Sequence, residues 1–380
     1  MPHRKHIAFV NSWYPSRVSP TNGDFIQRHA EAVALLHDVS ALHVVTDPAL
    51  DRRVEFVHRD VNGVNTWIAY IAPTRNPIWK VWRFWKAYRK LFKEIGKPDL
   101  LHVNRTFPAG IIAVFYRLFF NIPYLITEHW TGYHPDRQAS ISLIERRCAM
   151  FITCLAAFVC PVSEHLGQSM RSLGFKGRYH PVPNVVKTAV FHPDSSSPSS
   201  DIFTVLHVSN MVDSHKNITG LLEGLAQFMK RNNKVHLQLI GDNPQRYIPF
   251  VNEMDIDLDR CAFIDQLPQE ELAEYMRHAD VFVLFSNKEN LPCVILESFA
   301  SGTPVISTRV GGIEEYFPSD YGILIPKGDI EALNIALEEV YKNKGRLATA
   351  ESMFAYARNH FSPMAIARSF DKLYRIAGEG

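Results

Sequence analysis

The sequence is poor in cysteine and has no long uninterrupted hydrophobic run. Its five cysteines are odd in number and form no C-x-x-C pair, so they predict buried thiols in a reducing compartment, not a disulfide or zinc framework. The most apolar windows, residues 107–127 and 148–162, are broken by polar residues or too short to span a bilayer. The first residues also lack the apolar stretch of a signal peptide. We therefore expect a cytoplasmic protein with no transmembrane helix.

An excess of charge of one sign is also missing. The chain has 41 lysines and arginines against 39 aspartates and glutamates, and the formal net charge of +2 is too small to indicate a nucleic-acid partner. The G-x-G-x-x-G and G-x-x-x-x-G-K-[ST] patterns are absent, so a dinucleotide or P-loop site has no motif here. At 380 residues the chain exceeds one ordinary core and suits two α/β domains.

Residues 279–312 form the stretch around which the rest of the chain is organised. The apolar run 281–285 predicts a buried strand, and a polar loop follows it. Pro292 suits the first turn of a helix, for which Asn290 is the expected cap. Gly302 ends that helix, because glycine adopts the left-handed conformation of many helix ends. A short strand comes next, so this stretch predicts the strand-helix-strand unit of a parallel sheet.

Two glutamates fall at the edge of this unit where ligands of parallel sheets gather. Glu289 lies in the loop before the helix, and Glu297 lies within the helix. The helix N-terminus between them offers free N–H groups and a positive dipole end, which suit a phosphate. Sugar hydroxyls need hydrogen-bond acceptors and a diphosphate needs donors. The combination therefore indicates a nucleotide-sugar.

The run E-N-L-P-C-V-I-L-E-S-F-A-S-G-T-P-V, residues 289–305, resembles the Glu-x7-Glu signature of the retaining glycosyltransferases of family 4. The resemblance is strongest over residues 205–325 and looser before them. It implies an α/β fold of the GT-B type, in which two Rossmann-like parallel-sheet domains face each other across a cleft.

The GT-B resemblance divides the chain into two domains. Residues 1–193 are expected to form the acceptor-side domain, in which an Asn62-Gly63 turn predicts a hairpin. Residues 194–200 have the composition of a linker. Residues 201–361 are expected to bind the nucleotide-sugar, and a final helix of about residues 362–380 is expected to cross back to the first domain.

The resemblance implies catalytic roles for Glu289, His129 and Lys216. In the family a histidine at the position of His129 faces the donor sugar and a lysine at that of Lys216 holds the diphosphate. Alternatively, His129 is a structural histidine and Lys216 a solvated surface lysine. Donor binding is implied for Gly23, Asn210, Lys216, Gly241, Gln266, Leu267, Glu289, Asn290, Leu291, Pro292 and Glu297.

The sequence departs from the family pattern at two positions. The family's Gly-Gly pair in the first loop becomes Asn22-Gly23, where Gly23 either approaches the ligand or is only a turn glycine. The family's arginine a few residues before the lysine becomes Asn210. A first-domain cation, Arg17 or Arg28, could take its place.

The implied activity is transfer of a sugar, with retention, from a nucleotide-sugar to a glycan or lipid-linked acceptor in cell-surface polysaccharide or lipopolysaccharide biosynthesis. No cofactor and no metal are expected, and the D-x-D patterns within residues 255–259 are interpreted as solvated surface. Two alternatives stay open: a non-catalytic scaffold with the same fold, and a nucleotide-sugar epimerase.

Residues 76–97 combine tryptophans at helical spacing with lysines and arginines. Such a helix can lie on an anionic membrane, which would make the protein peripheral on the inner face. Alternatively, the aromatic stripe packs on the sheet and the basic residues are solvated.

Overall fold

The computed structural model describes residues 4–194 and 201–379, so most of the predicted linker lies outside the described residues. The chain divides into two compact units. Unit 1 comprises the chain up to Val185 and the C-terminal segment from Pro363, and unit 2 comprises Val186–Ser362. The division falls before the predicted domain end at residue 193, because the segment after Val185 packs with the second unit. The segment from Pro363 belongs to unit 1.

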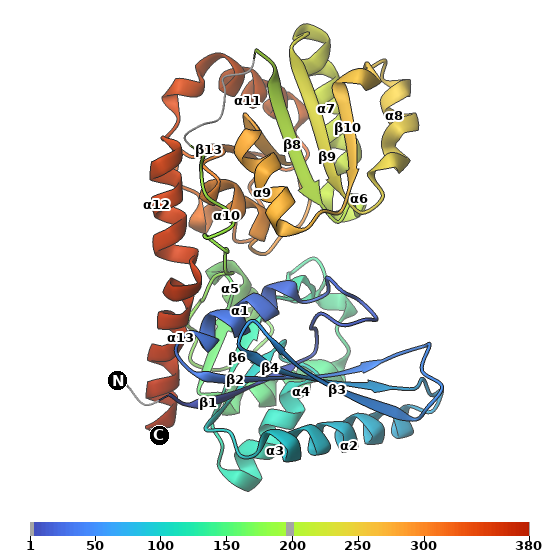
Figure 1. The fold of residues 1–380 in the computed structure, drawn as a ribbon, viewed down its shortest axis with the longest axis vertical. Coiled ribbons are helices and arrows are strands. Elements are labelled where there is room, and N and C mark those ends of the chain that lie inside the picture. The colour runs from blue at the N-terminus through green and yellow to red at the C-terminus, as the bar shows by residue number, and fades with distance from the viewer. Residues whose placement is uncertain (1–3, 195–200, 380) are drawn as a thin grey trace. The chain divides into compact units, whose positions relative to one another are not determined.

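Unit 1 is built on a seven-stranded sheet in the order β3-β4-β2-β1-β5-β6-β7 (Figure 1). Its strands are β1 (His6–Asn11), β2 (Asp38–Thr46), β3 (Val54–Val61), β4 (Val64–Ile71), β5 (Leu100–Asn104), β6 (Tyr124–Glu128) and β7 (Phe158–Pro161). Every neighbouring pair is parallel except β3 and β4, which form the predicted hairpin around Asn62-Gly63. The central strands are buried along almost their whole length, because helices cover both faces of the sheet.

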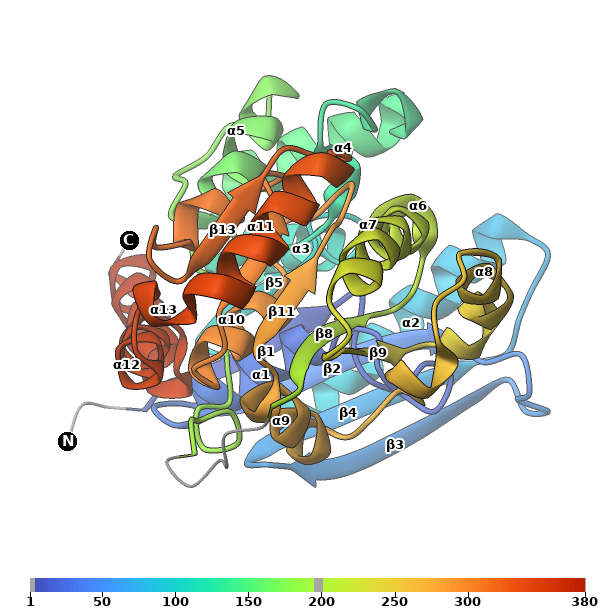
Figure 2. The ribbon, with the colours of Figure 1, turned by 90° about the horizontal axis from the view of Figure 1, so that it is seen from above.

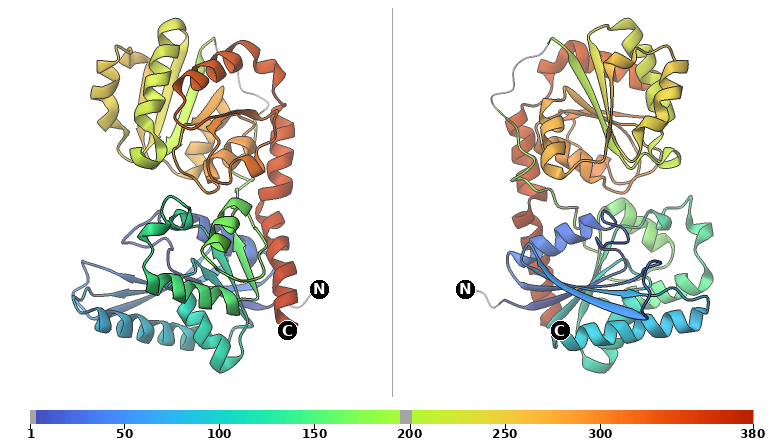
Figure 3. Two further views of the ribbon diagram at one scale, coloured as in Figure 1. Left: turned by 180° about the vertical axis from the view of Figure 1, so that it is seen from behind. Right: turned by 45° about the vertical axis from the view of Figure 1, so that its right-hand side comes forward.

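The helices of unit 1 are α1 (Asp24–Ala34), α2 (Pro77–Ile95), α3 (Gly110–Phe120), α4 (Leu143–Leu155), α5 (Glu164–Ser172) and α13 (Pro363–Gly378). Figures 1 and 3 show α2 and α3 along one face of this sheet. On the other, α13 packs against α1 and buries Ile366, Phe370 and Tyr374 in the core that includes Phe9. The last helix therefore completes unit 1.

Unit 2 is built on a six-stranded, entirely parallel sheet in the order β10-β9-β8-β11-β12-β13. Its strands are β8 (Phe203–Ser209), β9 (Val235–Gly241), β10 (Cys261–Asp265), β11 (Val281–Leu284), β12 (Val305–Thr308) and β13 (Gly322–Ile325). Its helices are α6 (Asp213–Lys216), α7 (Ile218–Arg231), α8 (Ile248–Glu253), α9 (Gln269–His278), α10 (Cys293–Ala300), α11 (Ile330–Asn343) and α12 (Ala350–Phe361). Two parallel-sheet α/β domains were predicted, and both are present.

Both sheets reverse their strand order at one point. In unit 2 the chain moves outward from β8 to β9 in one direction and from β11 to β12 in the other, and Figure 2 shows β8 between β9 and β11. In unit 1 the reversal lies between β1 and β5. The loops leaving the two strands at such a point diverge and leave a crevice at the carboxyl edge, which is where doubly wound sheets bind ligands.

The start of α10 differs from the prediction. Pro292 occupies the N-cap position with an extended backbone (φ −69°, ψ 125°), and the helix begins at Cys293. Asn290 is therefore not the cap, and no side chain caps this helix. The segment before the helix is instead tied to another loop, because the backbone N–H of Gly312 donates to the carbonyl of Asn290 at 2.8 Å, and the helix starts later than the proline pattern predicts.

No helix in the described part of the chain combines the length and the apolar character that crossing a membrane requires. Helix α2 begins after Asn76, whose side chain caps it by accepting from the backbone N–H groups of Ile78 and Trp79. The second half of α2 buries Tyr88, Leu91 and Phe92. Its first two turns, in contrast, do not pack on the sheet.

Candidate active site

An ion pair joins two of the predicted catalytic residues in unit 2. The Lys216 ammonium lies 2.5 Å from the nearer carboxylate oxygen of Glu289, and the Ser286 hydroxyl donates to the same oxygen at 2.8 Å. Side-chain exposure is 15% for Lys216 and 9% for Glu289. The alternative of a solvated surface lysine is therefore wrong. These residues follow β8 and β11, the two strands that flank the switch point.

The loop that carries Glu289 contacts two other segments of the chain. The backbone N–H groups of Asn287 and Lys288 donate to the carbonyl of His215, the residue before Lys216, at 2.7 and 3.3 Å. On the opposite side, Gly311 has φ +60° and lies so close that a Cβ atom there would be 2.0 Å from the carbonyl oxygen of Glu289. Only glycine fits such an approach. The Lys216–Glu289 geometry is thus fixed by backbone contacts.

Glu297, the second glutamate of the signature, lies within α10 and is 2% exposed. Asn290 and Leu291 are likewise buried, in the segment that leads into the helix. The predicted contact with a ribose stays a prediction.

The remaining predicted donor residues of unit 2 lie at the carboxyl ends of neighbouring strands. Asn210 follows β8 and is exposed, and Gly241 is the last residue of β9. Gln266 and Leu267 follow β10. The fold thus brings all of them to one sheet edge, where Lys216 and Glu289 are in direct contact.

Beside Asn210 lies a cation that the sequence analysis did not single out. The guanidinium of Arg246 donates to the carbonyl of Met211, to which the Tyr247 hydroxyl also donates at 3.1 Å. Arg246 comes from the short 3₁₀ helix Pro244–Tyr247 after β9. A cation therefore reaches the loop where the family arginine is replaced by Asn210.

Under this edge, His207 fills the interior of β8. Its Nδ1 lies 2.8 Å from the carbonyl oxygen of Val283 and its Nε2 lies 2.9 Å from the Ser209 hydroxyl. Burial lowers the pKa of His207 to about 4, and the nearby positive charge of Lys216 acts in the same direction. His207 is therefore neutral at physiological pH and links β8 to β11 by hydrogen bonding.

The other two predicted site residues, His129 and Gly23, lie in unit 1. His129 directly follows β6, and its ring contacts Phe25 at 4.5 Å and His29 at 5.4 Å between centroids. Removal from solvent holds the pKa of His129 well below its usual value, and His29 and His102 add to that shift. The neutral imidazole can accept or donate a hydrogen bond without carrying charge.

Gly23 is the N-cap residue of α1 and has φ +82°. A Cβ atom at this position would lie 2.8 Å from the carbonyl carbon of Trp13. The turn therefore requires glycine whether or not a ligand binds, and a role in donor binding stays a prediction.

Glu128 is a further buried carboxylate, and the sequence analysis assigned it no role. One of its oxygens accepts from the backbone N–H and the hydroxyl of Thr106 at 2.8 and 2.7 Å. The other accepts from the backbone N–H groups of His129 and Trp130, each at 2.9 Å. Glu128 thus fastens the loop after β5 to the loop after β6. The signal in the sequence was a glutamate at the carboxyl end of an apolar strand.

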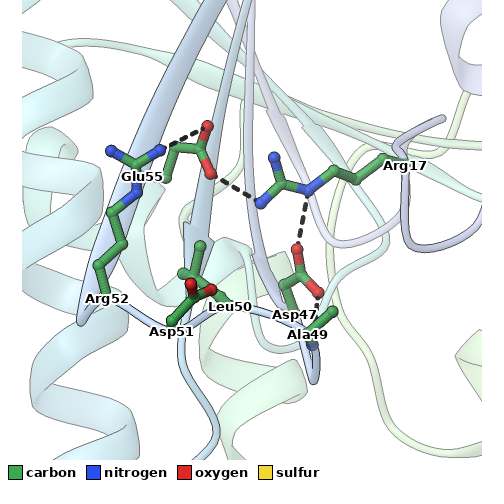
Figure 4. A pocket seen from close by; sticks show the side chains of 7 residues that line it. All are labelled: Arg17, Asp47, Ala49, Leu50, Asp51, Arg52 and Glu55. Carbon is green, nitrogen blue, oxygen red and sulfur yellow. Dashed lines mark hydrogen bonds and ion pairs between the residues drawn. The ribbon is translucent and has the colours of Figure 1, made fainter.

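A shallow pocket of about 450 Å³ opens near Arg17 in unit 1. Figure 4 shows the Arg17 guanidinium between Asp47 and Glu55, with both carboxylates at 2.8 Å. Arg17 is the main cause of the lowered pKa of Glu55. Arg28 pairs with Asp24 at 2.9 Å. Both cations proposed as substitutes for the family arginine are thus already neutralised by carboxylates.

Among the described residues, no group of three or more histidine, cysteine, aspartate or glutamate side chains is placed to hold a metal ion. The D-x-D segment is exposed at Asp255, Asp257 and Asp259, as predicted. Asp257 uses its carboxylate to accept from the backbone N–H of Asp259 at 3.0 Å. These aspartates form a surface turn.

Comparison with protein families identifies both units. The model of the glycosyl transferases group 1 family matches residues 202–343, and the model of the glycosyl transferase 4-like domain matches residues 24–185. The chain is 24% identical over 369 residues to the putative teichuronic acid biosynthesis glycosyltransferase TuaC of Bacillus subtilis, a match that covers 88% of the chain and 90% of TuaC. It is 27% identical over 277 residues to the alpha-monoglucosyldiacylglycerol synthase of Streptococcus pneumoniae, covering 66% and 61%.

Other curated relatives match over a smaller part, and the chain spans 32% and 42% of the length of two of them. Among solved structures, the sucrose-phosphate synthase of Thermosynechococcus elongatus matches with a TM-score of 0.78 and 24% identity over 98% of both chains. Anabaena HepE, in complex with UDP-glucose, matches with a TM-score of 0.70 and 17% identity over 97% of this chain and 99% of its own. These likenesses concern the fold, which is GT-B.

Proposed function

Because this chain belongs to the glycosyl transferases of group 1, we propose that it moves a sugar from a nucleoside diphosphate to a glycan or lipid-linked acceptor with retention of configuration. The observation that carries the proposal is the contact of Lys216 with Glu289 at the switch point of unit 2. A nucleotide-sugar needs a cation for its diphosphate and a carboxylate for its sugar hydroxyls, and this edge offers both.

In the proposed reaction the bond between the sugar's anomeric carbon and the diphosphate oxygen breaks, and a bond to the acceptor hydroxyl forms on the same face. The transition state is oxocarbenium-like, and negative charge grows on the departing diphosphate. Lys216 and the backbone N–H groups at the start of α10 stabilise that charge. The leaving phosphate oxygen takes the acceptor's proton, so no protein base is required and no metal enters the step.

The paired state of Lys216 has a consequence for donor binding. Without a ligand the charges of Lys216 and Glu289 largely cancel, and a diphosphate competes with Glu289 for the ammonium. The carboxylate released in this way becomes available to the hydroxyls of the sugar. Binding of the diphosphate and binding of the sugar are therefore coupled. A nucleoside diphosphate without the sugar displaces Glu289 from Lys216 but offers no hydroxyls to the released carboxylate.

The identity of the donor nucleotide draws support from Anabaena HepE, which has the same fold and is described with UDP-glucose. We propose a uridine or other nucleoside diphosphate sugar as the donor. Its base lies by Gln266 and Leu267, its ribose by Glu297, and its diphosphate by Lys216. His129 and Gly23 contribute from unit 1, His129 as a neutral hydrogen-bonding group facing the sugar.

The names of the relatives favour an envelope glycan as product. TuaC is named for teichuronic acid biosynthesis, and the streptococcal relative is named for a glycolipid. We propose that this chain acts in cell-surface polysaccharide or lipopolysaccharide biosynthesis, in the cytoplasm. The competing proposal is a non-catalytic scaffold with the same fold, favoured by Asn210 in place of the arginine.

We also propose a peripheral contact with anionic membrane through α2. In its first two turns Ile78 is 78% exposed, Trp79 54% and Val81 70%, while Lys80 and Lys86 are exposed beside them. Tryptophan and lysine side chains of this kind suit the headgroup region of an anionic bilayer. Phe119 on α3, which packs beside α2 through the Trp85–Phe115 contact, extends the apolar surface.

The donor proposal is tested by thermal unfolding with a panel of nucleotides and nucleotide-sugars. One donor, at about a hundred times its Kd, should raise the midpoint by several degrees, because saturation at that level contributes about 2.7 kcal/mol. Glu289→Gln and Glu297→Gln should remove most of that shift, whereas Glu331→Gln, an exposed control on α11, should retain it. If no nucleotide or nucleotide-sugar raises the midpoint of the wild type, the result supports the non-catalytic scaffold instead of the transferase.

Transfer itself is tested by following the anomeric configuration of the product by NMR. Retention and insensitivity to a chelator are expected, and inversion or loss of activity with the chelator would contradict the mechanism. Conversion of the donor with no acceptor present would indicate the epimerase alternative.

Membrane contact is tested by sedimentation with vesicles of phosphatidylglycerol and phosphatidylcholine. The wild-type chain should bind the mixed vesicles, and the double substitution Trp79→Ala and Trp82→Ala should weaken binding at least about ten-fold. Ile335→Ala removes an equally exposed apolar side chain from unit 2 and should change nothing. Equal binding by all three proteins would refute the α2 contact.

A further inference from the structure

Arg105 opens the loop after β5 in unit 1, and the proposed donor site does not use it. β5 and β1 are the two strands that flank the switch point of this sheet. Trp13 lies in the loop after β1, and Trp130 lies in the loop after β6. Three loops thus bring one cation and two indoles to the edge where a doubly wound sheet binds ligands.

The guanidinium of Arg105 lies over both indoles. Its central carbon is 4.7 Å from the ring centroid of Trp13 and 4.5 Å from that of Trp130. The indole faces attract a cation but offer no hydrogen-bond acceptor. The stacking therefore fixes the position of the positive charge and leaves the N–H groups of Arg105 to be satisfied by something else.

Within residues 4–194 and 201–379, the Arg105 side chain makes no ion pair and no hydrogen bond, and its Nε atom is buried. Glu128 supplies no partner, because both of its oxygens accept from backbone N–H groups and from Thr106. Arg17, another cation in the loop after β1, is by contrast enclosed by two carboxylates. A half-buried arginine with five donors and no acceptor is suited to an anionic ligand.

The backbone supports the same conclusion. Arg105 has φ +69°, a conformation that a residue with a long side chain rarely adopts. The conformation is held by the N–H of Arg105, which donates to the carbonyl of Thr127 at 3.0 Å, and by the bonds from Thr106 to Glu128. Strain maintained by buried hydrogen bonds is concentrated at sites where a side chain must be positioned before its ligand arrives.

We propose that Arg105, flanked by Trp13 and Trp130, binds an oxyanion of the acceptor, either a phosphate ester or a carboxylate. The planar guanidinium can donate two parallel hydrogen bonds to either group. That the oxyanion belongs to the acceptor rests on the proposed function, whereas the anion site itself does not. Glu128 is a positioning residue for this site, since it holds Thr106 beside Arg105 and fixes the backbone of Trp130.

The test uses the full chain without nucleotide, so its outcome is independent of the donor site. Glycerol 3-phosphate and glucuronate are titrated as the phosphate and carboxylate probes, with glucose as the uncharged control. The variants are Arg105→Asn, since asparagine tolerates positive φ, and Arg117→Gln, which removes a charge from the far end of α3. The readouts are calorimetry and the indole N–H resonances of the tryptophans.

One anionic probe should bind the wild type and Arg117→Gln alike and bind Arg105→Asn at least about ten-fold more weakly. The stronger probe identifies the oxyanion. In the wild type that probe should shift the indole resonances of Trp13 and Trp130 and leave Trp82 unchanged. Equal binding by Arg105→Asn, no binding of either probe, or unshifted Trp13 and Trp130 resonances would each overturn the proposal. The resonance test holds even if the variant fails to fold.

Discussion

The two switch points of the molecule present their cations differently. In unit 2 the Lys216 ammonium is paired with Glu289, to which the Ser286 hydroxyl also donates. The positive and negative charges at this edge therefore largely cancel. In unit 1 the Arg105 guanidinium lies between two indoles, and the neighbouring Glu128 is occupied by backbone donors. A paired site suits a ligand with both hydroxyls and phosphates. A site with an unneutralised cation suits a ligand whose distinguishing group is an anion.

The units differ as well in how many neutral histidines they bury. Unit 1 buries His29 and His43, each with its pKa lowered to about 4 by desolvation, together with His102, and the pKa values of His102 and of the half-buried His129 are also held well below the usual range. Unit 2 has His207, also at about 4. The hydrogen bond between His43 Nδ1 and the carbonyl oxygen of Asn11, at 3.0 Å, favours the protonated ring, but the cost of burying the charge outweighs it.

The largest effect that would sharpen this comparison is a difference in acid stability. A histidine whose folded pKa is lowered binds fewer protons than the unfolded chain between pH 6.5 and 4, so stability falls as the pH falls through that window. At pH 5 the loss is about 2 kcal/mol for each histidine shifted to about 4. Unit 1 should therefore lose about 4 kcal/mol from His29 and His43 alone, and unit 2 about 2 kcal/mol from His207.

Hydrogen exchange read by mass spectrometry at pH 7.5 and pH 5, with intrinsic rates corrected, would measure the two units separately. Peptides from β1 and β2 should lose more protection free energy than peptides from β8 and β11. An equal loss in both sheets would mean that the buried histidines do not distinguish the units.

A smaller effect should follow from removing the Glu128 carboxylate, which joins the loops after β5 and β6 in unit 1. Glu128→Ala removes the acceptor of four hydrogen bonds at a fully buried position, and we expect a loss of about 3 kcal/mol in the free energy of unfolding. Glu94→Ala, at an exposed position on α2, is the matched control and should stay within about 0.5 kcal/mol of wild type. Denaturant titration measures both.

The same substitution should weaken anion binding at Arg105, because Thr106 and Trp130 lose their common anchor. Normal stability together with normal anion binding in Glu128→Ala would show that the loops of unit 1 hold their positions without the carboxylate. The Lys216–Glu289 pair in unit 2 is not expected to respond.

The smallest effect concerns the hydroxyl beside the ion pair of unit 2. Ser286→Ala removes one hydrogen bond to Glu289 and should reduce stability by about 1 kcal/mol. Transfer should slow by about ten-fold or less, since the Lys216 contact remains and only the orientation of the carboxylate is loosened. Ser319→Ala, at an exposed serine, serves as the control in steady-state kinetics. A larger loss in Ser286→Ala than in Glu289→Gln would contradict the assignment of Glu289 as the principal group.

Much of the donor edge could be predicted from local sequence. The apolar run of β11, the glycine at residue 302 and the strand after it specify a strand-helix-strand unit, since strand burial and helix ends depend on neighbouring residues. That both units are parallel-sheet α/β domains was predictable for the same reason. The start of α10 was not, because the segment before it contacts Gly311 and Gly312, which lie beyond the next strand.

Contacts between loops decided the rest. The sequence by itself determined which residues end each strand and therefore which side chains reach a carboxyl edge, including Glu289, Lys216 and His129. It contained no signal that Arg105 would lie over Trp13 and Trp130, or that Glu128 would be occupied by backbone donors. Those partners come from separate strands, and strand order and the register between neighbours bring them together only in the folded sheet. Pairing of charges is therefore a property of the tertiary structure, whereas the placement of charges at strand ends is a property of the sequence.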